Sequence, residues 1–141
     1  MNARLKFSDS LNLIRSFKTS GTITPSSKVL IKTLLAPIDF TSARCIIELG
    51  PGTGCVTRSI LERMHADCVL ICFEVNSDFV GQLEALQDSR LRVVNACASS
   101  IRTILDDLVI EEVDHIVSSL PLALIDNEVV KRILESARSN L

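Results

Sequence analysis

Apolar residues occur along the chain in two alternating patterns, short unbroken runs and longer stretches with a helical period. The short runs have the length and continuity of strands that are covered on both faces of a sheet. They occupy residues 45–49, 68–73, 91–95 and 113–118, and stretches with helical spacing follow them at residues 55–65, 76–87, 99–108 and 126–137. Strands alternating with helices predict βαβ units. Right-handed crossovers then give a doubly wound, mainly parallel, Rossmann-like α/β sheet.

Two further helices are predicted before the first strand. Residues 4–18 carry an apolar stripe of helical period. A second helix would begin at Pro25, with Thr24 as its N-cap, and end before Pro37. We therefore divide the chain into an N-terminal helical segment, residues 1–36, and an α/β domain, residues 37–141, within a single domain overall.

The helix predicted at residues 4–18 has two interpretations. As an amphipathic helix it packs on its own domain. As a basic interfacial helix it docks on anionic lipid. The positive charges beside its apolar stripe are Arg4, Lys6, Arg15 and Lys18.

The composition excludes several classes of protein. The 141 residues fit one domain, with 47% hydrophobic and 23% charged residues. The formal net charge of −2 argues against a protein whose whole surface binds nucleic acid, but it is compatible with a local basic patch. No apolar run approaches the ~18 residues of a membrane-spanning helix, and the N-terminus lacks the pattern of a signal peptide. We expect a cytoplasmic protein, soluble or peripheral at the inner face of the membrane.

The five cysteines lie mainly within apolar runs. An odd number, no pair at CxxC spacing and only two histidines predict neither a disulfide framework nor a zinc site. We expect buried thiols in a reducing compartment and no bound metal.

Candidate chemistry gathers where the predicted strands end. In an open α/β sheet, ligands bind beyond the carboxyl ends of the strands, at the switch point. After the first strand comes the turn Gly50-Pro51-Gly52-Thr53-Gly54. Its glycines permit positive φ and close approach of a ligand, and the helix that follows offers free N–H groups. An adenosine cofactor with a charged tail fits this environment.

The next strand ends add polar groups at the same edge. Glu74, 20 residues after Gly54, could accept hydrogen bonds from both hydroxyls of a ribose. Asn95, Ala96 and Cys97 end the third strand, where they could meet an adenine edge. The fourth strand leads into residues 118–122, which would face the reacting centre.

Two known phosphate-binding motifs fit this turn less well. The dinucleotide fingerprint GxGxxG would require a third glycine at position 55, which is Cys55. A phosphate-loop NTPase would require Gly-Lys-Ser/Thr after the turn, and none follows. The pattern GxGxG suits a nucleoside cofactor without a pyrophosphate.

These residues resemble a known superfamily. The segment Glu48-Leu49-Gly50-Pro51-Gly52-Thr53-Gly54 resembles motif I of class I S-adenosylmethionine-dependent methyltransferases, and Phe73-Glu74-Val75-Asn76 resembles the acidic motif after their second strand. Together with residues 21–27 (GTITPSS) and 117–122 (VSSLPL), they are most similar to the bacterial phospholipid N-methyltransferases. That family is related to the ribosomal RNA adenine dimethyltransferases, and it methylates the amine of phosphatidylethanolamine.

The resemblance implies a set of site residues. The glycines would contact the methionine portion of the cofactor with Glu48 nearby, Glu74 would hold the ribose, and Ser26 and Ser27 would help to close the site. The cofactor-binding set is Glu48, Gly50, Pro51, Gly52, Thr53, Gly54, Glu74, Val75, Asn76, Ala96, Cys97 and Ser118. The acceptor-loop candidates are Ser118, Ser119, Leu120 and Pro121. No catalytic residue is assigned, because methyl transfer from a sulfonium mainly needs proximity and alignment.

Departures from the pattern bear on the substrate. Adenine N-methyltransferases place an aromatic ring after the fourth strand, but here the segment is Ser-Ser-Leu-Pro-Leu and the chain has no Tyr or Trp. N-methylation of a phospholipid amine is therefore favoured over an RNA substrate. In the lipid branch this loop usually reads Ser-Gly-Leu-Pro-Leu, and Ser119 replaces its glycine.

The length is a further departure. The family's sheet has seven strands, and this chain stops after the helix that follows strand four, as if truncated. The outer edge of strand four would then be unpaired. Three explanations stay open: a fragmentary or degenerate product that binds only a cofactor or a partner, an edge completed by self-association or another chain, and a minimal cofactor-binding domain.

Overall fold

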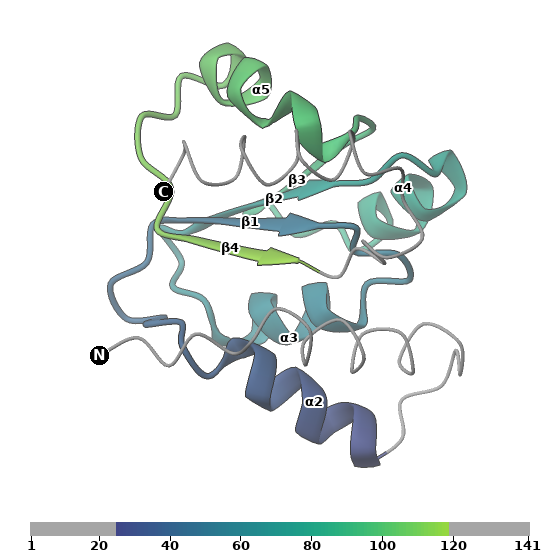
Figure 1. Ribbon diagram of the computed structural model, residues 1–141, viewed down its shortest axis with the longest axis vertical. Helices are drawn as coiled ribbons and strands as arrows, with labels where there is room; N and C mark the ends of the chain where they lie inside the picture. Colours follow the sequence, from purple (N-terminus) through teal and green to yellow (C-terminus); the bar gives the residue numbers. More distant parts are fainter. Residues whose placement is uncertain (1–24, 119–141) are drawn as a thin grey trace.

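A four-stranded parallel sheet forms the centre of the protein, seen in a computed structural model that describes residues 25–118 (Figure 1). The strands are β1 (Cys45–Leu49), β2 (Val69–Phe73), β3 (Leu91–Val94) and β4 (His115–Ser118). The helices are α2 (Pro25–Leu35), α3 (Cys55–Arg63), α4 (Ser77–Glu84), the short 3₁₀ turn η1 (Ala98–Ser100) and α5 (Ile101–Asp107). The doubly wound, parallel α/β fold expected from the sequence is confirmed.

The strand order is β3-β2-β1-β4, and every pairing is parallel. From β1 the chain first winds outward through β2 to β3, then returns to place β4 on the other side of β1. The switch point therefore lies between β1 and β4, directly beside the loop that leaves β1.

Two apolar layers cover the sheet. On one side, α2 and α3 pack on β1 through a cluster that includes Ile46, Leu35 and Ile60, all fully buried. On the other side, α5 packs through Ile101 against a second cluster that includes Ile47 (Figure 1). Because neighbouring residues of β1 face opposite layers, its whole length is buried, which explains why its sequence is an unbroken apolar run.

Several predicted boundaries move by one to three residues. The helix predicted to reach residue 87 ends at Glu84, and Gln87 takes a φ of 51°, which a helix cannot continue. The strand predicted from residue 113 begins at His115, where its pairing with β1 starts. Just before it, the Asp114 carboxylate accepts the backbone N–H groups of Arg44 and Cys45 at 2.7 and 2.9 Å.

Some expectations fall outside the described residues. These are the helices at residues 4–18 and 126–137, and Thr24 as an N-cap. The helix predicted from Pro25 begins there and ends at Leu35. No helix among residues 25–118 is long and apolar enough to cross a membrane.

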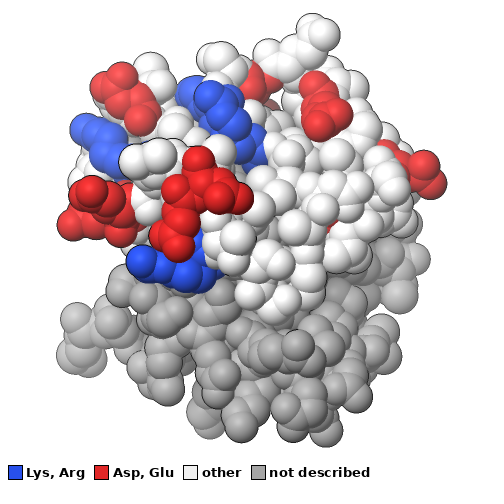
Figure 2. Space-filling model, turned by 90° about the horizontal axis from the view of Figure 1, so that it is seen from above, with Lys and Arg blue, Asp and Glu red and all other residues white. Residues whose placement is uncertain are grey.

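Charged side chains of both signs are interspersed on the face seen from the α5 side (Figure 2). The described part of that face shows no continuous basic surface of the kind that extended nucleic-acid binding uses.

Candidate functional site

The loop between β1 and α3 runs through three glycines with positive φ. The values are 67° at Gly50, 57° at Gly52 and 88° at Gly54. A Cβ on Gly54 would lie 2.9 Å from Leu83 Cδ2, so this glycine lets α4 pack closely. Gly52 is itself buried, but a Cβ added to it would meet no heavy atom within 4 Å, so there is room beside its backbone. Gly52 is thus the point where the loop could be approached by a ligand.

Glu74 joins the end of β2 to this loop. Its Oε1 accepts the Gly52 N–H at 2.9 Å, and its Oε2 accepts the Asn76 N–H at 3.1 Å. The side chain is largely buried, with 7% of the residue exposed. An ionised carboxylate has about four lone-pair sites, so two bonds leave acceptor capacity for hydroxyl groups of a ligand. The two residues on which the sequence argument chiefly depends therefore lie in direct contact.

Further hydrogen bonds hold the loop in place. The Gly50 N–H donates to the carbonyl of Phe73 at 3.0 Å, and the Gly54 N–H donates to the carbonyl of Pro51 at 3.0 Å. The Arg58 guanidinium reaches back from α3 to the carbonyl of Thr53 at 3.0 Å. The loop is ordered by the protein itself.

Glu48 lies at the base of the loop, next to the last residue of β1. Its residue is completely buried, and its Oε2 accepts the Thr57 hydroxyl at 2.6 Å and the Cys72 thiol at 3.4 Å. Burial, together with the Glu48 charge, raises the pKa of the Cys72 thiol well above its usual value. In this arrangement Glu48 contacts the helix and sheet around the loop.

The residues after Glu74 divide between two roles. The Asn76 side chain accepts the Asp78 N–H at 2.9 Å and so caps α4. Val75 is 67% exposed, an unusually open position for an apolar side chain at the end of a buried strand. Asn76 thus orients α4, whereas Val75 offers apolar surface next to Glu74.

The remaining strand ends meet the loop at the same sheet edge. In the sheet register Leu49 pairs with both Phe73 and Ser118, and Phe73 pairs with Val94. Ala96 and Cys97, which follow β3, are half-buried. The structure therefore gathers the described site residues at one edge. Ser119, Leu120 and Pro121 lie outside the described residues, and of Ser26 and Ser27 only the backbone, in the first turn of α2, is described.

Sequence reasoning missed Thr57 and Arg58, which fix α3 against the loop. Their signal was weak, because a threonine and an arginine in an amphipathic helix usually need no special explanation. The informative feature was Glu48, a charged residue inside an otherwise apolar strand, since a buried charge requires a partner.

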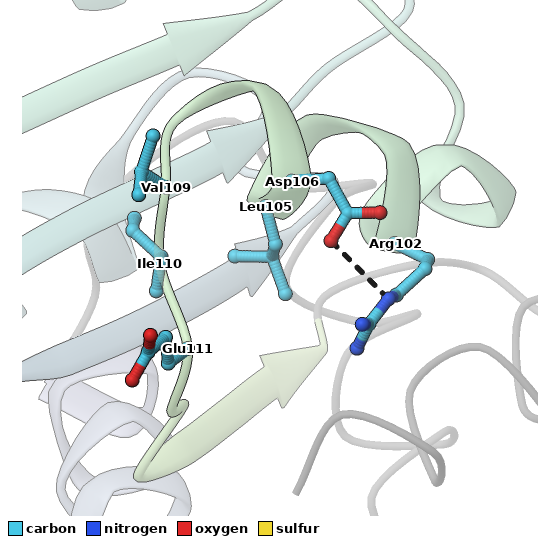
Figure 3. A pocket seen from close by; sticks show the side chains of 6 residues that line it. All are labelled: Arg102, Leu105, Asp106, Val109, Ile110 and Glu111. Carbon is cyan, nitrogen blue, oxygen red and sulfur yellow. Dashed lines mark ion pairs between the residues drawn. The ribbon is translucent and has the colours of Figure 1, made fainter.

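A hollow lies away from this edge (Figure 3). It has a volume of about 280 Å³ and forms where α5 ends and the chain returns toward the start of β4. Arg102 and Asp106 form an ion pair across 3.4 Å at its rim. The hollow is thus at the amino ends of the strands, opposite the glycine loop. Its lining residues are Arg102, Leu105, Asp106, Val109, Ile110 and Glu111.

Comparison with known proteins gives one informative curated relative. The chain is 34% identical to the ornithine lipid N-methyltransferase of Singulisphaera acidiphila over 123 residues, which cover 81% of this chain and 64% of that relative. The chain thus spans less than two thirds of the relative's length. No family model matches the chain. The resemblance to lipid N-methyltransferases that the motifs indicate is confirmed at the level of sequence similarity.

Solved structures share the fold at low sequence identity. The mycolic acid cyclopropane synthase CmaA1, complexed with SAH and CTAB, aligns with a TM-score of 0.66 and 15% identity over 95% of this chain and 49% of its own. The O-methyltransferase TomG from Streptomyces achromogenes, in complex with SAM, aligns with a TM-score of 0.62 and 19% identity. The alignment covers 93% of this chain and 60% of TomG. TrmN from Thermus thermophilus aligns with a TM-score of 0.64 and 16% identity, and the alignment covers 93% of this chain and 38% of TrmN. At these identities the likeness concerns the fold.

Proposed function

We propose that this chain is an S-adenosylmethionine-dependent methyltransferase domain that N-methylates the amine of a polar lipid. The observation that carries the proposal is the hydrogen bond between Glu74 and the Gly52 N–H, beside the switch point of the sheet. Through this bond, a backbone segment without a side chain and a carboxylate acceptor lie next to each other, as a nucleoside site requires. Both the curated relative and the TomG complex carry names consistent with this chemistry.

The residues present fit the cofactor in chemical type. Gly52 adds no side chain to the space beside it, so the methionine portion would lie along the loop. The ribose hydroxyls would donate to the free acceptor sites of Glu74. Ala96 and Cys97 would flank adenine, with the exposed Val75 side chain adding apolar surface. Glu48 would act from the base of the loop, through its contact with Thr57.

Bound S-adenosylmethionine would supply a methyl group already activated by its sulfonium. The chain's own contribution is then to hold that group and the acceptor amine in line, and to keep water out. Residues 118–122, which follow β4 at the site edge, are the proposed acceptor segment. The proposal assigns no general base.

A lipid amine is the favoured acceptor. The curated relative is named for an ornithine lipid, and the motif resemblance points to phosphatidylethanolamine, so the shared group is a primary amine on a polar lipid. The chain has no Tyr or Trp with which to stack a flipped base. The basic residues beside the apolar stripe of residues 4–18 would bring the domain to an anionic membrane surface.

Calorimetry with S-adenosylmethionine, followed by methyl transfer to lipid vesicles, tests the proposal. We expect wild-type protein to bind the cofactor, and Glu74→Ala to weaken binding about 100-fold, because two charge-assisted contacts are lost. Glu84→Ala, at an exposed position of α4, is the matched control and should bind like wild type.

Absence of binding at millimolar cofactor would contradict the cofactor assignment. Binding with methyl incorporation into RNA, and none into phosphatidylethanolamine or ornithine lipid, would contradict the lipid assignment. Binding without turnover on any acceptor would reduce the proposal to a cofactor-binding domain.

A further inference from the structure

The glycine loop has no side chains at the three positions that determine its path. Gly50, Gly52 and Gly54 all adopt positive φ, and glycine has the largest conformational freedom of any residue. The position of the loop must therefore come from the elements that it joins and from bonds to its backbone.

A buried side-chain pair lies at the base of the loop. Thr57 lies in the first turn of α3, and Glu48 is the penultimate residue of β1. Both residues are completely buried, and the Thr57 hydroxyl donates to Glu48 Oε2 at 2.6 Å. The N-cap position of α3 is Gly54, which makes no side-chain cap. The Thr57 hydroxyl thus ties the first turn of this helix to the strand before the loop.

Other hydrogen bonds of the loop do not join β1 to α3. Gly50 and Gly52 are tied to the end of β2, through Phe73 and Glu74. Arg58 holds the carbonyl of Thr53 from an exposed position, where water competes for the same groups. The Thr57–Glu48 bond is shielded from water, so it is the stronger constraint on the distance between the two ends of the loop.

We propose that Thr57 is a positioning residue for the cofactor loop. Through Glu48 it holds the start of α3 against β1, and it thereby keeps the backbone from Gly52 to Gly54 in the arrangement that receives the cofactor. Its effect on affinity rests on the proposed function, whereas its effect on the loop does not.

Hydrogen exchange of the loop amides in the cofactor-free, 141-residue protein tests the positioning role directly. Thr57→Val keeps the shape of the side chain and removes the donor. We expect the Gly52 and Gly54 amides to exchange about ten-fold faster in this variant, since local opening becomes easier. Thr57→Ser restores the hydroxyl and should restore the wild-type rates.

Cys72→Ala is the matched control, because it removes a different donor from the same Glu48 carboxylate and leaves the Thr57 hydroxyl in place. It should leave the loop amides within about two-fold of wild type. Equal acceleration in Thr57→Val and Cys72→Ala would overturn the proposal, since the effect would then come from Glu48 and not from the helix. Unchanged exchange in a folded Thr57→Val protein would overturn it too.

Cofactor affinity gives the second readout. Thr57→Val should bind S-adenosylmethionine about ten-fold more weakly than wild type, because the loop must now be ordered on binding, and Thr57→Ser should bind normally. If wild type itself binds no cofactor, the proposed function fails, but the exchange comparison still decides the role of Thr57. Faster exchange with unchanged affinity would overturn the link between loop order and binding.

Discussion

Single residues of the glycine loop serve different purposes, although the sequence presents them as equivalent. At Gly54 a side chain would collide with Leu83, whereas at Gly52 it would meet no heavy atom within 4 Å. The first position concerns the packing of α4, and the second concerns the ligand. Substitutions at the two positions should therefore separate stability from binding.

Gly52→Ala should lower the free energy of unfolding by about 1 kcal/mol, because alanine is strained at a φ of 57°. It should also remove detectable cofactor binding, since the added methyl group fills the space next to the backbone. Gly54→Ala should cost more stability, because it adds the contact with Leu83 to the same strain. Urea denaturation and calorimetry of both variants check this. Gly52→Ala binding as tightly as wild type would place the ligand elsewhere.

How much of the site the sequence predicts depends on whether the contact is local. Glycines after a strand and an acid 20 residues further on can be recognised, since backbone geometry dictates both. The bond from Thr57 to Glu48 spans a loop whose path cannot be read from residue types. The sequence therefore predicted Glu48 near the cofactor, which stays a prediction, but it did not predict the bond to Thr57.

At the scale of the elements, β1 has the bounds expected, because all five of its residues are buried between two helical layers. The start of β4 is shifted, because Val113 is apolar and packs in the core without pairing in the sheet. The apolar pattern of the sequence shows which residues are buried, but it does not show which of them pair with a neighbouring strand. Here the Asp114 side chain bonds to the start of β1, a contact that the pattern does not reveal.

The Asp114 cap makes the stability of this strand entry depend on pH. The backbone N–H groups of Arg44 and Cys45 lower the pKa of the Asp114 carboxyl. A carboxyl with a depressed pKa in the folded state stabilises the fold above its ordinary pKa, and the contribution is lost as the pH falls through the folded value. Asp114→Asn should thus be less stable than wild type at pH 7, by a small amount because water screens this exposed carboxylate, and the difference should shrink below about pH 4. Urea denaturation across this range measures it. Asp107→Asn, at an exposed site of α5, is the control, and a difference that grows in acid would contradict the assignment.

A second element-scale prediction concerns the end of α3. The Arg90 guanidinium donates to the carbonyls of Leu61 and Met64 at 2.9 and 3.0 Å, and pairs with Asp88 at 2.7 Å. It therefore satisfies two carbonyls at the helix terminus. Arg90→Met should lower the free energy of unfolding by about 2 kcal/mol, while Arg92→Met, on the exposed side of β3, should change it little. Equal effects in urea denaturation would mean that the cap does not stabilise α3.

At the scale of the whole molecule, the sheet carries one edge rich in candidate groups and one hollow at the opposite end. The site edge combines the loop, Glu74 and the end of β4, while the hollow beside α5 shares no residue with it. Under the proposed function the protein would also meet a membrane. The N-terminal segment is the proposed contact, because Arg4, Lys6, Arg15 and Lys18 lie beside its apolar stripe.

Vesicle sedimentation tests this membrane contact. Removal of residues 1–20 should reduce binding to anionic vesicles at low salt about ten-fold or more, because each basic residue near such a surface contributes about 1 kcal/mol. Binding to neutral vesicles should be weak for both proteins. Undiminished sedimentation of the shortened protein with anionic vesicles would eliminate this role.

The central claim is that a nucleoside cofactor occupies the space shared by the glycine loop and the end of β2. Titration of labelled protein with S-adenosylmethionine, followed through the amide resonances of Gly52 and Val75, tests it most directly. Both resonances should shift along the same saturation curve, while the amide of Val109 at the distant hollow stays in place. Saturable shifts confined to the hollow, or no shift at Gly52 in a folded protein, would contradict the account.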